Sequence, residues 1–138
     1  MDTKEFIEQL NEDLGIEYQS IIQYVQHTAT IKGAEYMAFV GDLGKHLSEE
    51  LEHAKTLAAQ IHFLGGTPTV EVPAVPDHPY GASALQADLE LEERQLERYR
   101  IRYREANELG LPDVGEALRP LLEQTQHHVI ELRDTLGR

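Results

Sequence analysis

Residues 65–81 read GGTPTVEVPAVPDHPYG and differ in composition from the rest of the chain. They include four of the six prolines in the chain and three of its ten glycines. Proline lacks the amide hydrogen that a helix needs and glycine disfavours helix, so no helix can cross this stretch. The sequence on either side has helical character. The stretch therefore predicts a long connection between two helical halves of the chain.

Two shorter breaks divide each half into a pair of helices. Gly33 interrupts the first half, and Gly110-Leu111-Pro112 interrupts the second. The helices are expected at about 3–31, 35–64, 83–109 and 113–136. Tight turns join the two helices of each pair, so each pair should form an antiparallel hairpin, with residues 65–82 crossing between the hairpins. The predicted fold is an all-α, antiparallel four-helix bundle in which Pro120 kinks the last helix or divides it into a short turn and a longer segment.

Length and composition narrow the class of protein. The chain of 138 residues suits one domain covering 1–138. A net charge of −13 disfavours nucleic acid as a partner. The absence of cysteine excludes disulfides and thiolate metal sites, so any metal must be held by oxygen and imidazole nitrogen. No apolar run reaches the ~20 residues of a membrane span, and the first residues do not resemble a signal peptide, so we expect a cytoplasmic protein.

Glutamates occupy the middle of the apolar stripe on three of the predicted helices. Steps of three and four residues place Glu17, Glu50 and Glu92 among apolar residues of their helices. The flanking stripe residues are Leu10, Leu14, Ile21, Tyr24, Thr28 and Ile31; Leu43, Leu47, Ala54, Leu57, Ile61 and Leu64; and Leu85, Leu89, Leu96, Tyr99, Tyr103 and Ala106. Unpaired buried carboxylates are costly and would repel one another. A divalent cation resolves both problems, because hard oxygen ligands suit it.

Histidines support the same hypothesis. His53 follows Glu50 by three residues, and His128 follows Thr125 by three, so each pair shares a helix face. The fourth helix therefore repeats the second, with Thr125 in the position of the glutamate. The sequence predicts a metal site built from the three mid-stripe glutamates and from these two histidines.

The other polar residues favour ordinary interpretations. We expect four further histidines to lie on the surface or in loops and not to be metal ligands: His27, His46, His62 and His78. Glu123 lies about 200° around the helix from Thr125, at ~100° per residue, and should face solvent. The tyrosines of the stripes are expected first of all to be core aromatics whose hydroxyl groups need partners.

Four segments carry a family resemblance: LGIEYQSIIQYVQH, SEELEHAKTLAAQIHFLGGTPT, ADLELEERQLE and LLEQTQHHVIEL. With them the chain resembles the bacterioferritins and their relatives in the ferritin-like di-iron carboxylate superfamily. The resemblance implies a ferritin-like bundle that binds iron through Glu17, Glu50, His53, Glu92 and His128. It also implies that Glu50 and a second carboxylate bridge two irons. Tyr24 matches a tyrosine beside the metals in bacterioferritins, where it could donate an electron.

Three departures from that family pattern affect the expectations. Thr125 replaces the second bridging glutamate, which removes one ligand. Leu51 stands where bacterioferritins have the methionine that binds haem, so no haem is expected. The short fifth helix that lines the channels of large cages has no counterpart here. We therefore expect a homodimer or larger homo-oligomer in preference to a closed cage.

Three functions remain open from the sequence. The leading hypothesis is a ferroxidase-type oxidoreductase that binds one or two Fe²⁺ ions per chain and oxidises them with O₂ or peroxide. The second is a non-catalytic or mononuclear metal-binding bundle, suggested by Thr125. The third is a plain bundle whose buried polar residues set helix pairing or serve a partner protein. Manganese suits the same oxygen and imidazole ligands as iron.

Overall fold

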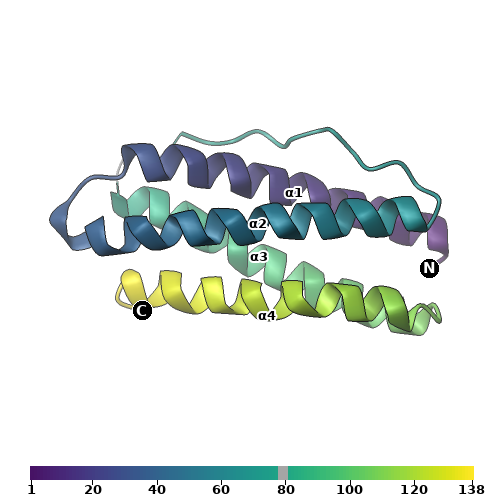
Figure 1. The fold of residues 1–138 in the computed structure, drawn as a ribbon. Coiled ribbons are helices and arrows are strands. Elements are labelled where there is room, and N and C mark those ends of the chain that lie inside the picture. The colour runs from purple at the N-terminus through teal and green to yellow at the C-terminus, as the bar shows by residue number, and fades with distance from the viewer. Residues whose placement is uncertain (78–80) are drawn as a thin grey trace.

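Four long helices form an antiparallel bundle in the computed structural model, which describes residues 1–77 and 81–138 (Figure 1). The helices are α1 (Thr3–Thr30), α2 (Met37–Phe63), α3 (Gly81–Glu108) and α4 (Pro112–Thr135), with the 3₁₀ helix η1 (Ala34–Tyr36) before α2. None of the described residues lies in a strand. The predicted fold class is confirmed, with α2 beginning two residues later and α3 two residues earlier than expected.

The helix ends follow local chemistry. The Asp2 side chain accepts a hydrogen bond from Glu5 N at 2.8 Å, and Glu5 Oε2 accepts one from Asp2 N at 3.3 Å. This reciprocal cap satisfies amide groups that the first turn of α1 would leave unpaired. Pro112 opens α4, where its missing N–H costs nothing. α4 continues through Pro120 to Thr135, so Pro120 does not divide the helix.

The crossover leaves the end of α2 and runs along the outside of α1 (Figure 1). Gly65 has φ 94°, a conformation that favours glycine. A Cβ on Gly66 would lie only 2.6 Å from Ile7 Cγ2, so the chain can approach α1 here only without a side chain. Asn11 then holds the crossover, donating to Thr67 O at 3.1 Å and accepting from Thr69 N at 2.8 Å.

Two apolar clusters fill the bundle on either side of its middle. One contains Phe6, Leu10, Leu14, Ala54, Leu57, Ile61, Tyr99, Ala106, Val114, Leu118 and Leu121. The other contains Tyr24, Ile31, Phe39, Leu43, Ala84, Leu85, Leu89, Leu96, Val129 and Leu132. On α1 the first cluster uses residues before Glu17 and the second uses residues after it, whereas on α2 the order around Glu50 is reversed. The mid-stripe glutamates therefore lie between two apolar regions.

The residues of the predicted stripes are buried or half-buried, except Thr28, which is exposed two residues before the end of α1. Within the described ranges, 1–77 and 81–138, no helix is apolar and long enough to cross a membrane.

Candidate metal centre

All four helices contribute to one buried polar layer. Glu17 comes from α1, Glu50 and His53 from α2, and Glu92 from α3. Thr125 and His128 come from α4. Each of these six side chains belongs to a residue that is at most 2% exposed. The structure therefore brings together every residue that the sequence predicted for the site.

The layer contains two overlapping groups that share Glu50. We call Glu17, Glu50 and His53 the Glu17 half-site, and Glu50, Glu92 and His128 the Glu92 half-site. In each half-site, one ligand atom of every residue lies within 4.8 Å of the others. His53 lies beside Oε2 of Glu50 and His128 beside Oε1, so this carboxylate can face a cation in either half-site.

Distances from the imidazoles show how the half-sites are arranged. His53 Nδ1 lies 3.5 Å from Glu50 Oε2 and 3.7 Å from Glu17 Oε1. His128 Nδ1 lies 2.9 Å from Glu50 Oε1 and 3.5 Å from Glu92 Oε1. Both rings thus turn Nδ1 toward the shared carboxylate.

Several polar atoms of the layer are buried without hydrogen-bond partners among the described residues: Glu17 Oε2, Glu92 Oε2, His53 Nδ1, His128 Nε2 and Thr125 Oγ1. An unpaired buried polar group costs about 1–3 kcal/mol. A cation would bind the free carboxylate oxygens and the imidazole nitrogen, and this donor set suits iron or manganese. The residues present therefore fit a metal site.

The pKa values of the layer indicate which side chains carry protons when no cation balances the buried carboxylates. Burial and the neighbouring Glu17 and Glu92 carboxylates raise the pKa of Glu50 well above its ordinary value. Burial opposes ionisation of Glu17, but hydrogen bonds from Glu50 and His53 outweigh it and lower the Glu17 pKa. Burial likewise opposes protonation of His53, yet Glu17 and Glu50 raise its pKa to about 11. Protons on Glu50 and His53 therefore occupy the place of a cation's charge.

Two buried tyrosines hold the glutamates from opposite helices. Tyr24 donates to Glu92 Oε1 at 2.7 Å, and Tyr99 donates to Glu17 Oε1. Each tyrosine follows the glutamate of its own helix by seven residues. Tyr99 was expected only to be a core aromatic, although this equal spacing could have identified it as the counterpart of Tyr24.

The Nε2 atoms of His53 and His128, which point away from the Glu50 carboxylate, differ in their contacts. His53 Nε2 lies 2.7 Å from Gln124 Oε1. Because an amide oxygen only accepts, this contact puts a proton on Nε2 and leaves Nδ1 to face the carboxylates. His128 Nε2 instead has no hydrogen-bond partner among the described residues and lies 3.5 Å from Glu49 Oε2. Neither Gln124 nor Glu49 was predicted from the sequence.

His46 was predicted to lie on the surface, and this prediction is wrong. It is 1% exposed, and its ring stacks on that of His128 with centroids 4.0 Å apart. His46 Nε2 lies 2.7 Å from Glu131 Oε2, which holds the ring in place. The signal in the sequence is that His46 precedes Glu50 by four residues and so shares its helix face.

The remaining histidine predictions have mixed outcomes. His27 is also buried, at 3% exposure, because it pairs with Asp88 at 2.7 Å. His62 is exposed as predicted, and His78 lies outside the described residues. Glu123 is exposed as predicted.

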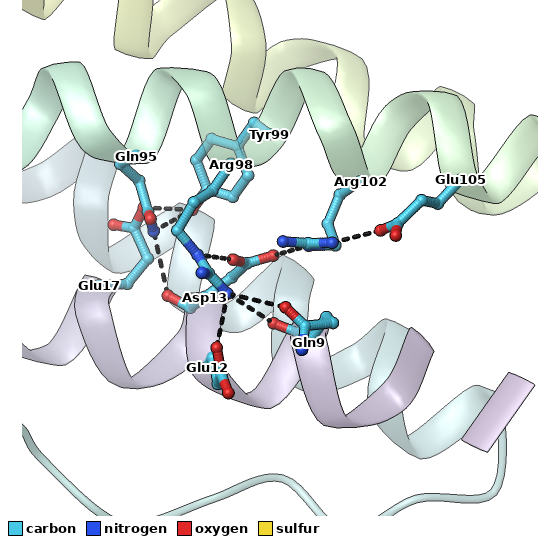
Figure 2. A network of polar contacts seen from close by, with 9 residues as sticks. All are labelled: Gln9, Glu12, Asp13, Glu17, Gln95, Arg98, Tyr99, Arg102 and Glu105. Atoms are coloured by element: carbon cyan, nitrogen blue, oxygen red, sulfur yellow. Dashed lines mark hydrogen bonds and ion pairs between the residues drawn. The ribbon is translucent and has the colours of Figure 1, made fainter. Parts of the chain in front are cut away.

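An arginine network, defined here as Asp13, Arg98 and Arg102, joins α3 to α1 beside the Glu17 half-site (Figure 2). Arg98 Nε donates to Asp13 Oδ1 at 2.6 Å, and Arg102 Nε donates to Asp13 Oδ2 at 2.8 Å. Burial raises the pKa of Asp13 to about 6, while the two guanidinium groups oppose this rise. Asp13 is thus ionised at neutral pH. Gln95 extends the link by donating to Glu17 Oε1 at 3.0 Å.

A histidine network, defined as Asp88, His27 and Gln23, makes a second link between α1 and α3. His27 Nδ1 lies 2.7 Å from Asp88 Oδ2, and Gln23 Nε2 donates to Asp88 Oδ1 at 3.0 Å. Burial raises the pKa of Asp88, although His27 opposes the rise. The two networks therefore fix α1 against α3 on either side of the metal centre.

The bundle and its buried layer of carboxylates and imidazoles are those of the ferritin-like class of helical proteins. The family model described as the ferritin-like domain matches residues 7–138. The chain therefore belongs to the ferritin-like family.

Solved structures agree with this assignment. A ferritin-like, diiron-carboxylate protein from Bacillus anthracis str. Ames is 32% identical, with a TM-score of 0.93 over 99% of this chain and 98% of that one. A bacterioferritin-related protein from Bacteroides fragilis, described as a dodecameric thioferritin, is 24% identical, with a TM-score of 0.85 over 99% of this chain and 87% of that one. The second likeness shows the fold alone. No curated protein sequence matches the chain significantly.

Proposed function

We propose that the chain binds Fe²⁺ through its two half-sites and oxidises it with O₂ or peroxide. The observation that carries the proposal is the pair of overlapping, buried carboxylate–imidazole groups that share Glu50. Their unpartnered oxygens and nitrogen favour a cation over a purely structural role. Membership of the ferritin-like family supports iron as that cation. Manganese fits the same donors.

Iron is the substrate in this proposal, and it supplies the electrons. Two Fe²⁺ and two protons reduce one hydrogen peroxide to two waters, or one O₂ to hydrogen peroxide, leaving two Fe³⁺. The carboxylates of the protein stabilise the higher charge of the product ion. Glu50 keeps the two half-sites close together. Where only one Fe²⁺ is bound, Tyr24 would supply the second electron to the same oxidant and become a tyrosyl radical, with its phenolic proton passing to Glu92 Oε1.

Anaerobic titration of the metal-free protein with Fe²⁺, followed by exposure to air, tests the proposal. Near two irons per chain and a rapid rise in ferric absorbance would support oxidation at both half-sites. Binding without faster oxidation than in buffer would remove catalysis and leave a metal-binding protein. No bound iron would contradict the proposal altogether.

A second candidate is a metal-binding protein without oxidase activity, which Thr125 favours. Thr125 is fully buried in the layer but offers only a neutral hydroxyl. If the missing carboxylate limits the wild type, then Thr125→Glu should raise its oxidation rate, and Thr125→Val should leave it unchanged. A wild type already as fast as Thr125→Glu would exclude this candidate.

We also propose that the protein forms a homodimer or larger homo-oligomer. Ile22 on α1 is 37% exposed, and Val70 and Val72 of the crossover beside it are 89% and 43% exposed. Adjoining apolar side chains of this kind are typical of subunit contacts. The Bacteroides fragilis neighbour is described as a dodecamer, which adds support. Light scattering after gel filtration would give the number of chains, and a monomer at micromolar concentration would contradict the proposal.

A further inference from the structure

The metal centre is closed to solvent, so protons need a route to it. Each residue of the buried layer is at most 2% exposed. The proposed oxidation consumes two protons for each molecule of oxidant, and these protons come from water outside the bundle. A proton crosses a protein interior along groups that can both accept and donate one. Titratable side chains that join the layer to water are therefore the candidates for the route.

The outer end of the histidine network opens to a cavity beneath the crossover. His27 is 3% exposed and Asp88 is 2% exposed, and His27 Nδ1 lies 2.7 Å from Asp88 Oδ2. His27 also lines a cavity of about 320 Å³ between the end of α1 and residues 75–77, which we call the crossover cavity. Because Nδ1 faces Asp88, Nε2 is the ring nitrogen that remains to exchange a proton with water in this cavity. His27 therefore connects a buried carboxyl group with solvent.

The inner end of the histidine network lies near the hydrogen bond between Tyr24 and Glu92. Asp88 precedes Glu92 by four residues on α3, so the two carboxyl groups share a helix face. Burial, Glu92 and Asp88 together raise the pKa of Tyr24, so the three side chains interact electrostatically. Tyr24 in turn donates to Glu92 Oε1 at 2.7 Å. A water molecule between Asp88 and the Tyr24 hydroxyl would complete a path to the buried layer.

The arginine network, at the equivalent position, cannot carry a proton. Its aspartate, Asp13, is bound by Arg98 and Arg102, whose guanidinium groups only donate hydrogen bonds and are not deprotonated in proteins. An imidazole, by contrast, can accept a proton at one nitrogen and release one from the other. Of these two networks between α1 and α3, the histidine network is therefore the one that can relay protons.

The surroundings of Asp88 suit a group that gains and loses a proton. Burial raises the pKa of Asp88 and Glu92 adds to this rise, whereas His27 and Gln23 oppose it. A carboxyl group with a raised pKa exchanges its proton closer to neutral pH, which a relay needs. The charged groups near His27 are Asp88 on α3 and Asp77 of the crossover, which lines the same cavity.

We propose that His27 and Asp88 carry protons between the crossover cavity and the metal centre. A proton from water in the cavity binds His27 Nε2, and the proton on Nδ1 passes to Asp88 Oδ2. The Asp88 carboxyl group then releases it through a water molecule to the Tyr24 hydroxyl, whose own proton passes to Glu92 Oε1. Asp88 and Tyr24 return to their first protonation states, and His27 ends as its other tautomer. This inference rests on the proposed metal-binding function and deepens it, and protons leave the centre along the same groups.

Rapid mixing of the metal-free protein with Co²⁺ tests the route without iron oxidation. The visible absorption of Co²⁺ follows binding, and a pH indicator in weak buffer follows the protons that the cation displaces. The wild type should release protons as fast as it binds Co²⁺. His27→Gln should slow the release by at least about tenfold, with its extent and the Co²⁺ affinity unchanged. The glutamine amide can still donate to Asp88 but cannot relay a proton.

A second variant and a matched control complete the test. Asp88→Asn should slow the release as His27→Gln does, because an amide can accept from Gln23 but does not carry a proton. Thr30→Val, at an exposed position that lines the same cavity, is the control and should change neither the release nor the affinity. Circular dichroism of each variant checks that the bundle is folded.

The outcomes separate the proton route from the proposed function. Slow release in both variants with unchanged affinity would support the route, even in a protein that does not oxidise iron. Normal release in either variant, or Co²⁺ binding by the wild type without any release, would overturn the route and leave metal binding in place. Slow release in Glu49→Gln alone would also overturn it, by assigning proton exit to Glu49, which lies 3.5 Å from His128 Nε2. No Co²⁺ binding by the folded wild type would overturn both the route and the proposed function.

Discussion

The arginine network and the histidine network have the same spacing but different chemistry. Asp13 precedes Glu17 by four residues, and Asp88 precedes Glu92 by four. Each aspartate is reached by two side chains of the opposite helix, which follow that helix's glutamate by six and ten residues: Arg98 and Arg102, and Gln23 and His27. The two halves of the bundle thus place polar links at equivalent positions.

The difference lies in the groups that face each aspartate. The guanidinium groups of Arg98 and Arg102 are cations that can only donate hydrogen bonds. The imidazole of His27 offers a donor and an acceptor nitrogen, and the amide of Gln23 is neutral. The arginine network therefore depends on an ionised Asp13, whereas the histidine network can keep its hydrogen bonds without a full charge. Equivalent positions in the two halves need not contribute equally to stability.

The largest expected effect is that of Asp13→Asn. The change removes the fully buried counter-charge of Arg98 and Arg102, and leaves Arg102, which is 3% exposed, with only the part-buried Glu105 as its partner. Removing one partner of a buried ion pair costs about 3–5 kcal/mol in the free energy of unfolding. Urea denaturation of the metal-free protein measures it, with exposed Asp42→Asn on α2 as control. A loss below about 1 kcal/mol would show that the guanidinium groups find other partners.

Glu50 belongs to both half-sites, so Glu50→Gln should weaken metal binding at each of them. We expect the affinity for Fe²⁺ or Co²⁺ to fall by about a hundredfold or more, or ~2.7 kcal/mol. The metal-free variant should keep its stability at neutral pH, because glutamine resembles the protonated carboxyl that the raised pKa of Glu50 favours. Equilibrium dialysis and thermal unfolding measure the two effects. Retained affinity would mean that Glu50 is not a ligand.

Metal affinity should rise with pH. The pKa values of Glu50 and His53 are raised, so a cation must displace protons from them near neutral pH. Each displaced proton changes the apparent affinity by about tenfold per pH unit, or ~1.4 kcal/mol. Co²⁺ titrations at pH 6 and pH 7.5, with proton release measured in weak buffer, test this. Affinity that does not change with pH would contradict the assigned protonation.

The raised pKa of Glu50 makes the free energy of unfolding of the metal-free protein fall as pH rises, whereas the metal affinity increases. The protonated Glu50 carboxyl contributes stability that is fully present below its ordinary pKa of 4.5. That contribution is lost as pH rises through the higher pKa of the folded state. The metal-free protein should therefore gain more from a bound cation at high pH than at low pH.

The smallest expected effect is that of Asp88→Asn. Asparagine can still accept from Gln23, and a neutral His27 can accept from the new amide. We expect a loss of about 1 kcal/mol in the free energy of unfolding, the value of one ordinary hydrogen bond. Urea denaturation beside Asp13→Asn gives the comparison directly. Equal losses in the two variants would remove the distinction between the networks.

Periodicity was enough to predict the core of the site. Glu17, Glu50 and Glu92 interrupt regular apolar stripes, and a helix period of 3.6 residues fixes which face each presents. His53 and His128 follow at a spacing that keeps them on those faces. Residues 65–82 then fixed the topology, since a proline-rich stretch of that length can only cross between hairpins.

Helix periodicity could not predict the residues that surround the candidate ligands. His46 and His27 lie beside the stripes, where a small rotation of the helix decides between solvent and a neighbouring helix. Glu49 and Gln124 are each adjacent to a predicted site position, yet they reach the imidazole of another helix. Their roles depend on how α2 and α4 pack, which no pattern within one helix contains.

Local periodicity and the prolines were sufficient to predict four helices, their order, and five side chains that a cation could bind. The residues that contact those side chains, and the protons that they carry, became evident only from the packing of the helices. Helix geometry depends on near neighbours along the chain. The pKa of a buried group and the support of a ligand are fixed instead by neighbours in space, which come from other helices.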